Sequence, residues 1–165
     1  MRGEPSMSTM LLDDTDRKLL ALLQTDARAS HRQLARDMGV AQGTVTNRLK
    51  RLENAGVIQG YSAVLNPAYV GWSMTVMAGL RIFKGKMIDV QQKIAADTRV
   101  FAVYDVTGDW DSIVLARVQN REDLDNLTKT VFTLEGVERS YTHVVLNTVK
   151  EDALPQPAPS STKSS

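Results

Sequence analysis

The sequence predicts an α+β protein whose two parts have different element orders. Residues 12–56 show the apolar spacing of three short helices, and residues 72–150 alternate strand and helix signals in the order βαββαβ. That order is ferredoxin-like, with both helices on one face of a four-stranded sheet. Residues 57–71 are expected to be a hinge or linker strand, residues 1–11 a flexible lead, and residues 151–165, rich in Pro and Ser, a disordered tail.

The first two helices are predicted from leucine spacing and from their N-caps. The first covers Asp14 to Thr25, with Asp13 or Asp14 as N-cap and leucines at i, i+3 and i+4. The second begins at Ser30, which is expected to form a capping box with Gln33, each side chain bonding the other's backbone N–H. Gly39 follows the last turn of this helix, where a left-handed residue is favoured.

The third helix is expected to begin near Ala41 or Gln42 and to run to Ala55, with Val45 and Leu49 on its buried side. About three residues separate it from the second helix, and such a short turn holds two helices steeply crossed. This pattern predicts a helix-turn-helix of winged-helix-like type. The last helix of such a motif lies in the major groove of DNA.

The charge of the chain is unevenly distributed. The whole chain carries only +1, but the segment from Ala27 to Leu52 has six basic residues and one acid, a local charge of +5 against −4 elsewhere. Such a segment suits a polyanionic partner, although a solvated basic face would have the same composition.

The side chains on the second and third helices suit contacts with double-stranded DNA. Gln and Asn pair with adenine, Arg pairs with guanine, and a Thr methyl group packs against the thymine methyl group. Other basic side chains position the protein on phosphates. The expected base-contacting residues are Gln42, Thr44, Asn47 and Arg48, and the expected phosphate-contacting residues are His31, Arg32, Lys50 and Arg51.

Residues 12–66 resemble the DNA-binding half of the Lrp/AsnC regulators (leucine-responsive/asparagine, or feast/famine, regulators). The matching runs are LDDTDRKLLALLQTDARAS, QLARDMGV and TVTNRLKRLENAGVIQGYSAVLNP, and the resemblance continues to Lys150. The resemblance implies a transcriptional regulator that binds palindromic operators as a dimer, with tetramers or octamers as further assemblies. It also implies that the second half is an amino-acid-sensing domain.

Both faces of the predicted sheet are apolar, although helices would cover only one. The second strand, 100–106, is expected to place Val100 and Tyr104 on one side and Phe101 and Val103 on the other. A solvated face would be more polar, so we expect a homodimer whose sheets pack face to face.

The run VTGDWDSIVL combines a local structure with a resemblance. Gly-Asp between two apolar strands predicts a tight two-residue hairpin turn. The run also resembles the glycine-aspartate loop of the family, near which small effectors, commonly amino acids, bind between dimers. Backbone N–H groups of such a loop suit a carboxylate, and Asp109 or Asp111 suits an α-ammonium. The expected effector-binding residues are Tyr104, Thr107, Gly108, Asp109, Trp110, Asp111 and Thr142.

Trp110 departs from the family pattern, because Tyr or Phe is commoner at its position. The resemblance therefore leaves the shape of the effector pocket in doubt.

Other function classes are less well supported. The chain has no Cys, so thiolate metal sites are excluded. It has only two His residues, so a histidine-based metal site would have to use one of them. Asp105, Asp109 and Asp111 cluster in sequence, but no nucleophile or phosphate loop accompanies them, so we expect no enzyme, no metal and no cofactor apart from an amino-acid effector.

No apolar run reaches the roughly eighteen residues of a membrane helix, and the start lacks a secretory core. We therefore expect a cytoplasmic protein with no membrane partner. The alternative function is a stand-alone amino-acid sensor or metabolic partner with a non-functional helix-turn-helix, which the basic residues disfavour.

Overall fold

The computed structural model describes residues 10–151, which form two compact units, one reaching to Ala63 and one from Val64 to Lys150. The division falls inside the predicted linker 57–71. Within this linker the structure has a short 3-10 helix, η1 (Pro67–Val70), and no strand. Residues 1–9 of the predicted lead and residues 152–165 of the predicted tail lie outside the described residues.

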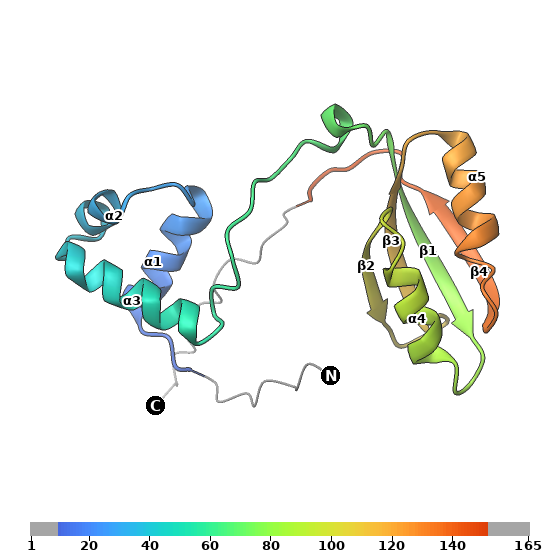
Figure 1. Ribbon diagram of the computed structural model, residues 1–165, viewed down its shortest axis with the longest axis horizontal. Helices are drawn as coiled ribbons and strands as arrows, with labels where there is room; N and C mark the ends of the chain where they lie inside the picture. Colours follow the sequence, from blue (N-terminus) through green and yellow to red (C-terminus); the bar gives the residue numbers. More distant parts are fainter. Residues whose placement is uncertain (1–9, 152–165) are drawn as a thin grey trace. The chain divides into compact units, whose positions relative to one another are not determined.

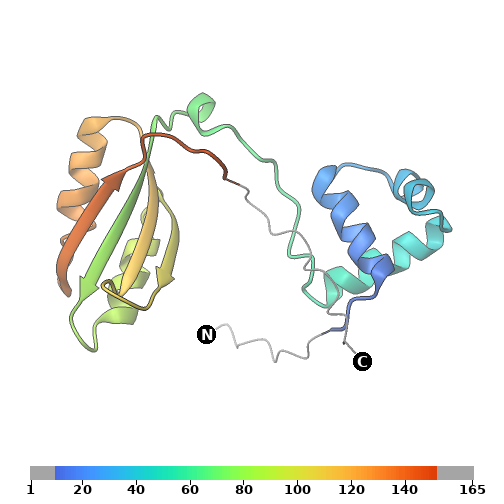
Figure 2. The same cartoon turned by 180° about the vertical axis from the view of Figure 1, so that it is seen from behind.

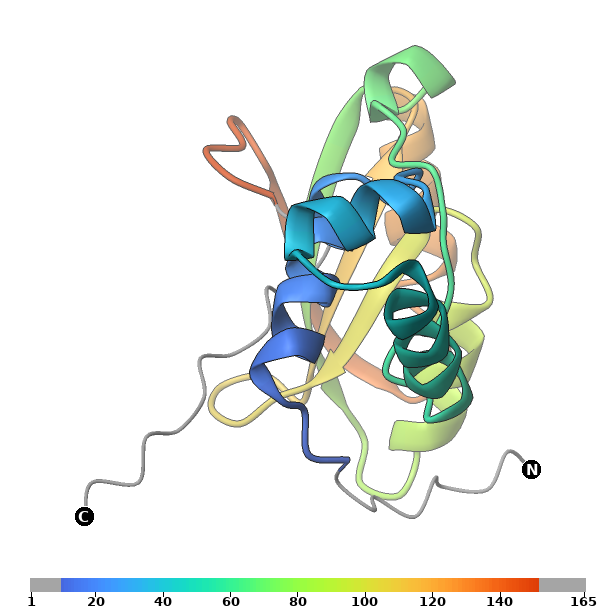
Figure 3. The ribbon, with the colours of Figure 1, turned by 90° about the vertical axis from the view of Figure 1, so that its left-hand side faces the viewer.

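The N-terminal unit contains the three predicted helices, α1 (Asp14–Thr25), α2 (His31–Met38) and α3 (Gln42–Asn54). Figure 3 shows α2 and α3 crossing steeply at their short turn. The leucine and valine stripes of the three helices meet in one core, in which Leu19, Leu34 and Val45 are at most 1% exposed. The helix-turn-helix prediction is confirmed.

The helix caps explain where α1 and α2 begin. Asp13 is the N-cap of α1 and forms a full capping box with Asp16. Ser30 caps α2 by accepting from the backbone N–H of Gln33, but the side chain of Gln33 donates to Asp37 instead of returning to Ser30. The predicted capping box of α2 is therefore only half formed.

The C-terminal unit confirms the ferredoxin-like order (Figure 1). Its elements are β1 (Met74–Ile82), α4 (Met87–Ala95), β2 (Val100–Asp105), β3 (Ser112–Val118), α5 (Arg121–Thr130) and β4 (Val137–Val144). The antiparallel sheet has the strand order β2-β3-β1-β4. Both helices pack on one face, where Val76, Ile94 and Leu127 are fully buried, and Figure 2 shows the opposite, uncovered face.

The predicted alternation of β2 is wrong, because the strand pairing shifts between Val100 and Ala102. After this irregularity Val103 pairs with the buried Val114 and packs in the core with Val100. Tyr104 pairs with Ile113 and Phe101 stacks on Arg117, both on the uncovered face. One extra residue in the strand thus exchanges the faces assigned to Val103 and Tyr104.

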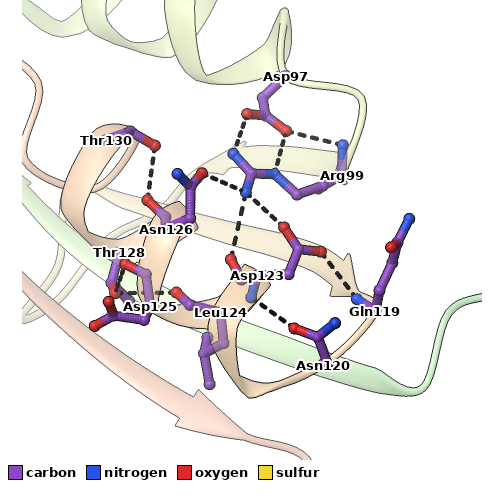
Figure 4. Close-up of polar contacts among 10 residues, drawn as sticks. All are labelled: Asp97, Arg99, Gln119, Asn120, Asp123, Leu124, Asp125, Asn126, Thr128 and Thr130. Atoms are coloured by element: carbon purple, nitrogen blue, oxygen red, sulfur yellow. Dashed lines mark hydrogen bonds and ion pairs between the residues drawn. The ribbon is translucent and has the colours of Figure 1, made fainter.

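Arg99 ties the turn before β2 to the start of α5 (Figure 4). Its guanidinium donates to Asp97 at 2.7 Å and to Asp123 at 2.8 Å, and also to the side-chain oxygen of Asn126. The side chains of Arg99, Asp97 and Asp123 are 14%, 19% and 22% exposed. Because these groups are largely shielded from water, their pairing holds two chain segments together.

Acid should weaken this contact. The hydrogen bonds from Arg99 hold the pKa of Asp97 below its ordinary value, so its stabilisation is complete above about pH 4 and lost as the pH falls through the lowered pKa. We expect the midpoint of urea unfolding of the C-terminal unit to decrease in the wild-type protein once the pH is lowered below about 4. The midpoint of Asp97→Asn should already be lower at neutral pH and should decrease less in acid. Parallel pH profiles of the two proteins would contradict this role.

Candidate DNA interface and effector loop

The exposed side of α3 is the candidate DNA interface. Val45, Leu49 and Leu52 form its buried stripe, so the opposite side is left for a partner. Of the predicted DNA-contacting residues, Thr44 and Arg48 are partly buried. The exposed ones are His31, Arg32, Gln42, Asn47, Lys50 and Arg51.

His31 connects α2 with α3. Its Nδ1 lies 2.9 Å from the hydroxyl of Thr46, which itself donates to the carbonyl of Gln42. The Thr46 hydroxyl therefore accepts from His31, which uses Nδ1 within the protein. In the neutral ring Nε2 is then an acceptor, so only the imidazolium form of His31 could donate to a phosphate.

Arg48 and Arg51 are bound to carboxylates of α1. Nη1 of Arg48 donates to Asp13 at 2.7 Å and to Asp16 at 2.7 Å, and Nη2 of Arg51 donates to Asp16 at 2.6 Å. Asp16 is fully buried, whereas the side chain of Asp13 is 52% exposed. These contacts join α3 to the start of α1, and sequence spacing did not predict them.

The same contacts change the electrostatics of the interface. The Arg48 hydrogen bond, followed by that of the Asp16 backbone, lowers the pKa of Asp13, and the two carboxylates raise the pKa of Arg48. Asp13 and Arg48 are therefore held in their charged forms, and the formal charges of the two acids offset two of the positive charges in the basic segment. The remaining positive charge comes mainly from Arg28, Arg32, Arg36 and Lys50.

The loop between β2 and β3 is wider than the predicted two-residue turn. The last bond of the hairpin joins the N–H of Val106 to the carbonyl of Asp111, so Thr107 to Trp110 form the loop tip. Gly108 has φ +109°, a conformation that favours glycine. The loop then bends over β1, where the N–H of Asp111 donates to Leu80 and its carboxylate accepts from Ile82.

Trp110 lies flat on the uncovered face at Gly79. A Cβ atom at Gly79 would come within 2.6 Å of the indole, so only glycine leaves room for it. The indole is stacked with Tyr141 at 6.3 Å between ring centroids, and Arg139 lies 5.1 Å from its ring. Trp110 therefore joins the loop to β1 and β4.

The structure brings together some of the predicted effector residues and separates one. Tyr104 and Trp110 are on the uncovered face, whereas Thr142 pairs with the buried Ala78 and faces the helices. The neighbouring Tyr141 takes the place beside Trp110. Strict alternation in β4 would have identified Tyr141 once the face of Trp110 was known.

The three aspartates near the loop do not form a common site. Asp105 bonds Gln91 of α4, Asp111 is held by Ile82 and Arg81, and Asp109 is exposed. Among residues 10–151 no group of three or more His, Cys, Asp or Glu residues is placed to hold a metal ion.

Known proteins share this two-part organisation. Residues 12–59 match the winged helix-turn-helix DNA-binding model, and residues 75–155 match the Lrp/AsnC ligand binding domain. An HTH-type transcriptional regulator of Pyrococcus abyssi is 44% identical over 86% of this chain and 97% of its own length. The leucine-responsive regulatory protein of Salmonella typhimurium is 33% identical over 85% of this chain and 88% of its own. The chain belongs to the Lrp/AsnC family.

A solved Lrp/AsnC structure supports the same assignment. The feast or famine regulatory protein from M. tuberculosis, complexed with L-methionine, is 32% identical with a TM-score of 0.81, covering 89% of this chain and 100% of that chain. This chain is thus an Lrp/AsnC-type transcriptional regulator with a DNA-binding helix-turn-helix and a ligand-binding domain. Within the described residues, no helix has the length and apolar character needed to cross a membrane.

Proposed function

We propose that this regulator binds palindromic operators as a homodimer or a higher oligomer, and that a small amino acid modulates its binding. The exposed side of α3 carries the proposal for DNA, because Asn47 and Lys50 lie away from its buried stripe and Gln42 is exposed in its first turn. Two such helices about one turn of DNA apart (~34 Å) suit a two-fold symmetric operator.

The uncovered face of the sheet supports the dimer. Met77 is 38% exposed, Phe101 42% and Tyr104 53%, and all three lie on this face. Large apolar groups gathered on one exposed face favour burial against a second copy of the chain. Tetramers or octamers built from such dimers are the higher oligomers of this proposal.

The effector proposal rests on the loop from Thr107 to Asp111. Two similar proteins, from M. tuberculosis and Neisseria meningitidis, were solved with L-methionine. In this chain the carboxylate of Asp111 already accepts from the backbone N–H of Ile82 and from the guanidinium of Arg81. The Asp109 side chain makes no hydrogen bond or ion pair among the described residues. Asp109 is therefore the better candidate for the α-ammonium of an amino acid, with Gly108 beside it.

A mobility-shift assay tests the DNA proposal directly. The duplex is the DNA upstream of the protein's own gene, with a random duplex of equal length as control, at low salt. We expect a slower-migrating complex that forms on the upstream duplex at lower protein concentration. A folded dimer that shifts neither duplex would instead support the stand-alone amino-acid sensor.

The two aspartates of the loop give a matched test of effector binding. The twenty amino acids are first screened with the wild-type protein by thermal shift. For the amino acid that binds, we expect Asp109→Asn to weaken binding about tenfold, the loss of one charge-assisted hydrogen bond, without lowering the melting temperature.

The same change at Asp111 should have the opposite pattern, because it removes contacts within the protein. Asp111→Asn should lower the melting temperature even without an amino acid present. Unchanged binding by Asp109→Asn would contradict the assignment of the α-ammonium to Asp109.

A further inference from the structure

Arg48 and Arg51 each use one terminal nitrogen for the carboxylates of α1. All contacts of Arg48 go through Nη1 and all contacts of Arg51 go through Nη2. Among the described residues, no hydrogen bond uses the Nε or the other terminal nitrogen of either group. Each guanidinium is thus fixed by one edge and keeps three N–H donors on its other edges.

These donors line a hollow on α3. Thr44, Asn47, Arg48 and Arg51 enclose a shallow volume of about 330 Å3. They are spaced i, i+3, i+4 and i+7, so they form one stripe of the helix. The stripe offers a hydroxyl, an amide and two guanidinium groups, which is a suitable set of donors for the oxygens of a phosphate.

The place of the two arginines on α3 favours phosphate over bases. Base edges are contacted mainly by the N-terminal residues of a recognition helix. Arg48 and Arg51 lie in the second and third turns, and Arg48 is drawn toward α1 with its side chain 25% exposed. A side chain anchored in this way is poorly placed to extend into the groove.

We propose that the hollow binds one phosphate of the DNA backbone, and that Asp13 and Asp16 are positioning residues that hold Arg48 and Arg51 for this contact. The inference rests on the proposed DNA binding and assigns Arg48 a role different from base reading. The carboxylates oppose a phosphate by charge but fix the two guanidinium groups before DNA arrives. A fixed donor loses less conformational entropy when it binds.

Asp13→Asn separates positioning from charge. Asn is as good an N-cap as Asp, so α1 keeps its start while the ion pair with Arg48 is removed. Asp14→Asn is the control, because it changes the charge equally at the same helix end and Asp14 makes no hydrogen bond or ion pair among the described residues. Charge alone predicts that both variants bind DNA slightly more tightly.

Positioning predicts different results for the two variants. We expect Asp13→Asn to weaken binding about tenfold on both operator and random duplex, the effect of one charge-assisted hydrogen bond. The slope of log K against log salt should become shallower by about 0.9, the value for one phosphate contact. Asp14→Asn should keep the wild-type slope and bind at least as tightly. In an Arg48→Ala background, Asp13→Asn should cause no further loss.

Two outcomes would overturn the proposal. Tighter binding by Asp13→Asn, equal to that of Asp14→Asn, would show that Asp13 acts only through its charge. A loss confined to the operator duplex would show that Arg48 reads a base. If Asp13→Asn unfolds, Arg48→Lys is used instead. This variant keeps the positive charge but lacks the second edge of donors, so its binding to both duplexes should weaken. A wild-type protein that shifts no DNA would contradict the proposed function itself.

Discussion

The substitution Asp16→Ala should destabilise the N-terminal unit by about 2–4 kcal/mol, because it removes the buried partner of two arginines. The Asp16 carboxylate is fully buried and accepts from Arg48, from Arg51 and from the backbone N–H of Asp13. The arginines are partly exposed and regain water, which keeps the loss below that of a fully buried pair. Urea unfolding followed by far-UV circular dichroism measures the change.

Asp14→Ala provides the matched control for this prediction. Asp14 is in the same first turn and is exposed, so its loss removes a favourable interaction with the helix dipole worth about 0.3–1 kcal/mol. If Asp16→Ala costs no more than Asp14→Ala, the contacts of Asp16 with α3 contribute nothing measurable, and the positioning role proposed for it loses its basis.

Helix positions in the N-terminal unit were predictable because they depend on local patterns. Asp13, Ser30 and Gly39 mark helix ends by interactions that span only a few residues. The contacts of Asp16 with Arg48 join residues 32 positions apart. In sequence Asp16 resembles an ordinary acid in the first turn of a helix, so its burial follows only from how α1 and α3 pack.

The candidate effector site was predictable only in part, for a similar reason. The loop lies between two strands as expected, but its tip spans Thr107 to Trp110 and Trp110 packs on β1, a contact that local spacing does not reveal. The faces of Tyr104 and Val103 depend on an irregularity between Val100 and Ala102 that strict alternation does not reveal. Thr142, expected at the loop, faces the helices, whereas its neighbour Tyr141 is stacked with Trp110. Which side chains contact an effector stays a prediction.

Gly79→Val should have the largest effect on the C-terminal unit, although valine is favoured in strands. A Cβ atom at this position would meet the Trp110 indole at 2.6 Å, so the ring must leave the sheet and give up its contact with Tyr141. We expect a loss of about 1–3 kcal/mol, as for other overpacked sites, together with a change in tryptophan fluorescence. The response to an amino-acid effector should weaken as well, because Trp110 connects the loop to the sheet.

Met77→Val is the control for Gly79→Val. It places the same side chain two residues away on the same face of β1, where Met77 is 38% exposed. If both variants have the same stability, fluorescence and effector response, the close contact of Gly79 with Trp110 is not what shapes the loop. If Trp110→Ala in the Gly79→Val background recovers stability but not effector response, the two effects separate. The steric conflict would then account for the stability loss, and the indole itself would be required for sensing.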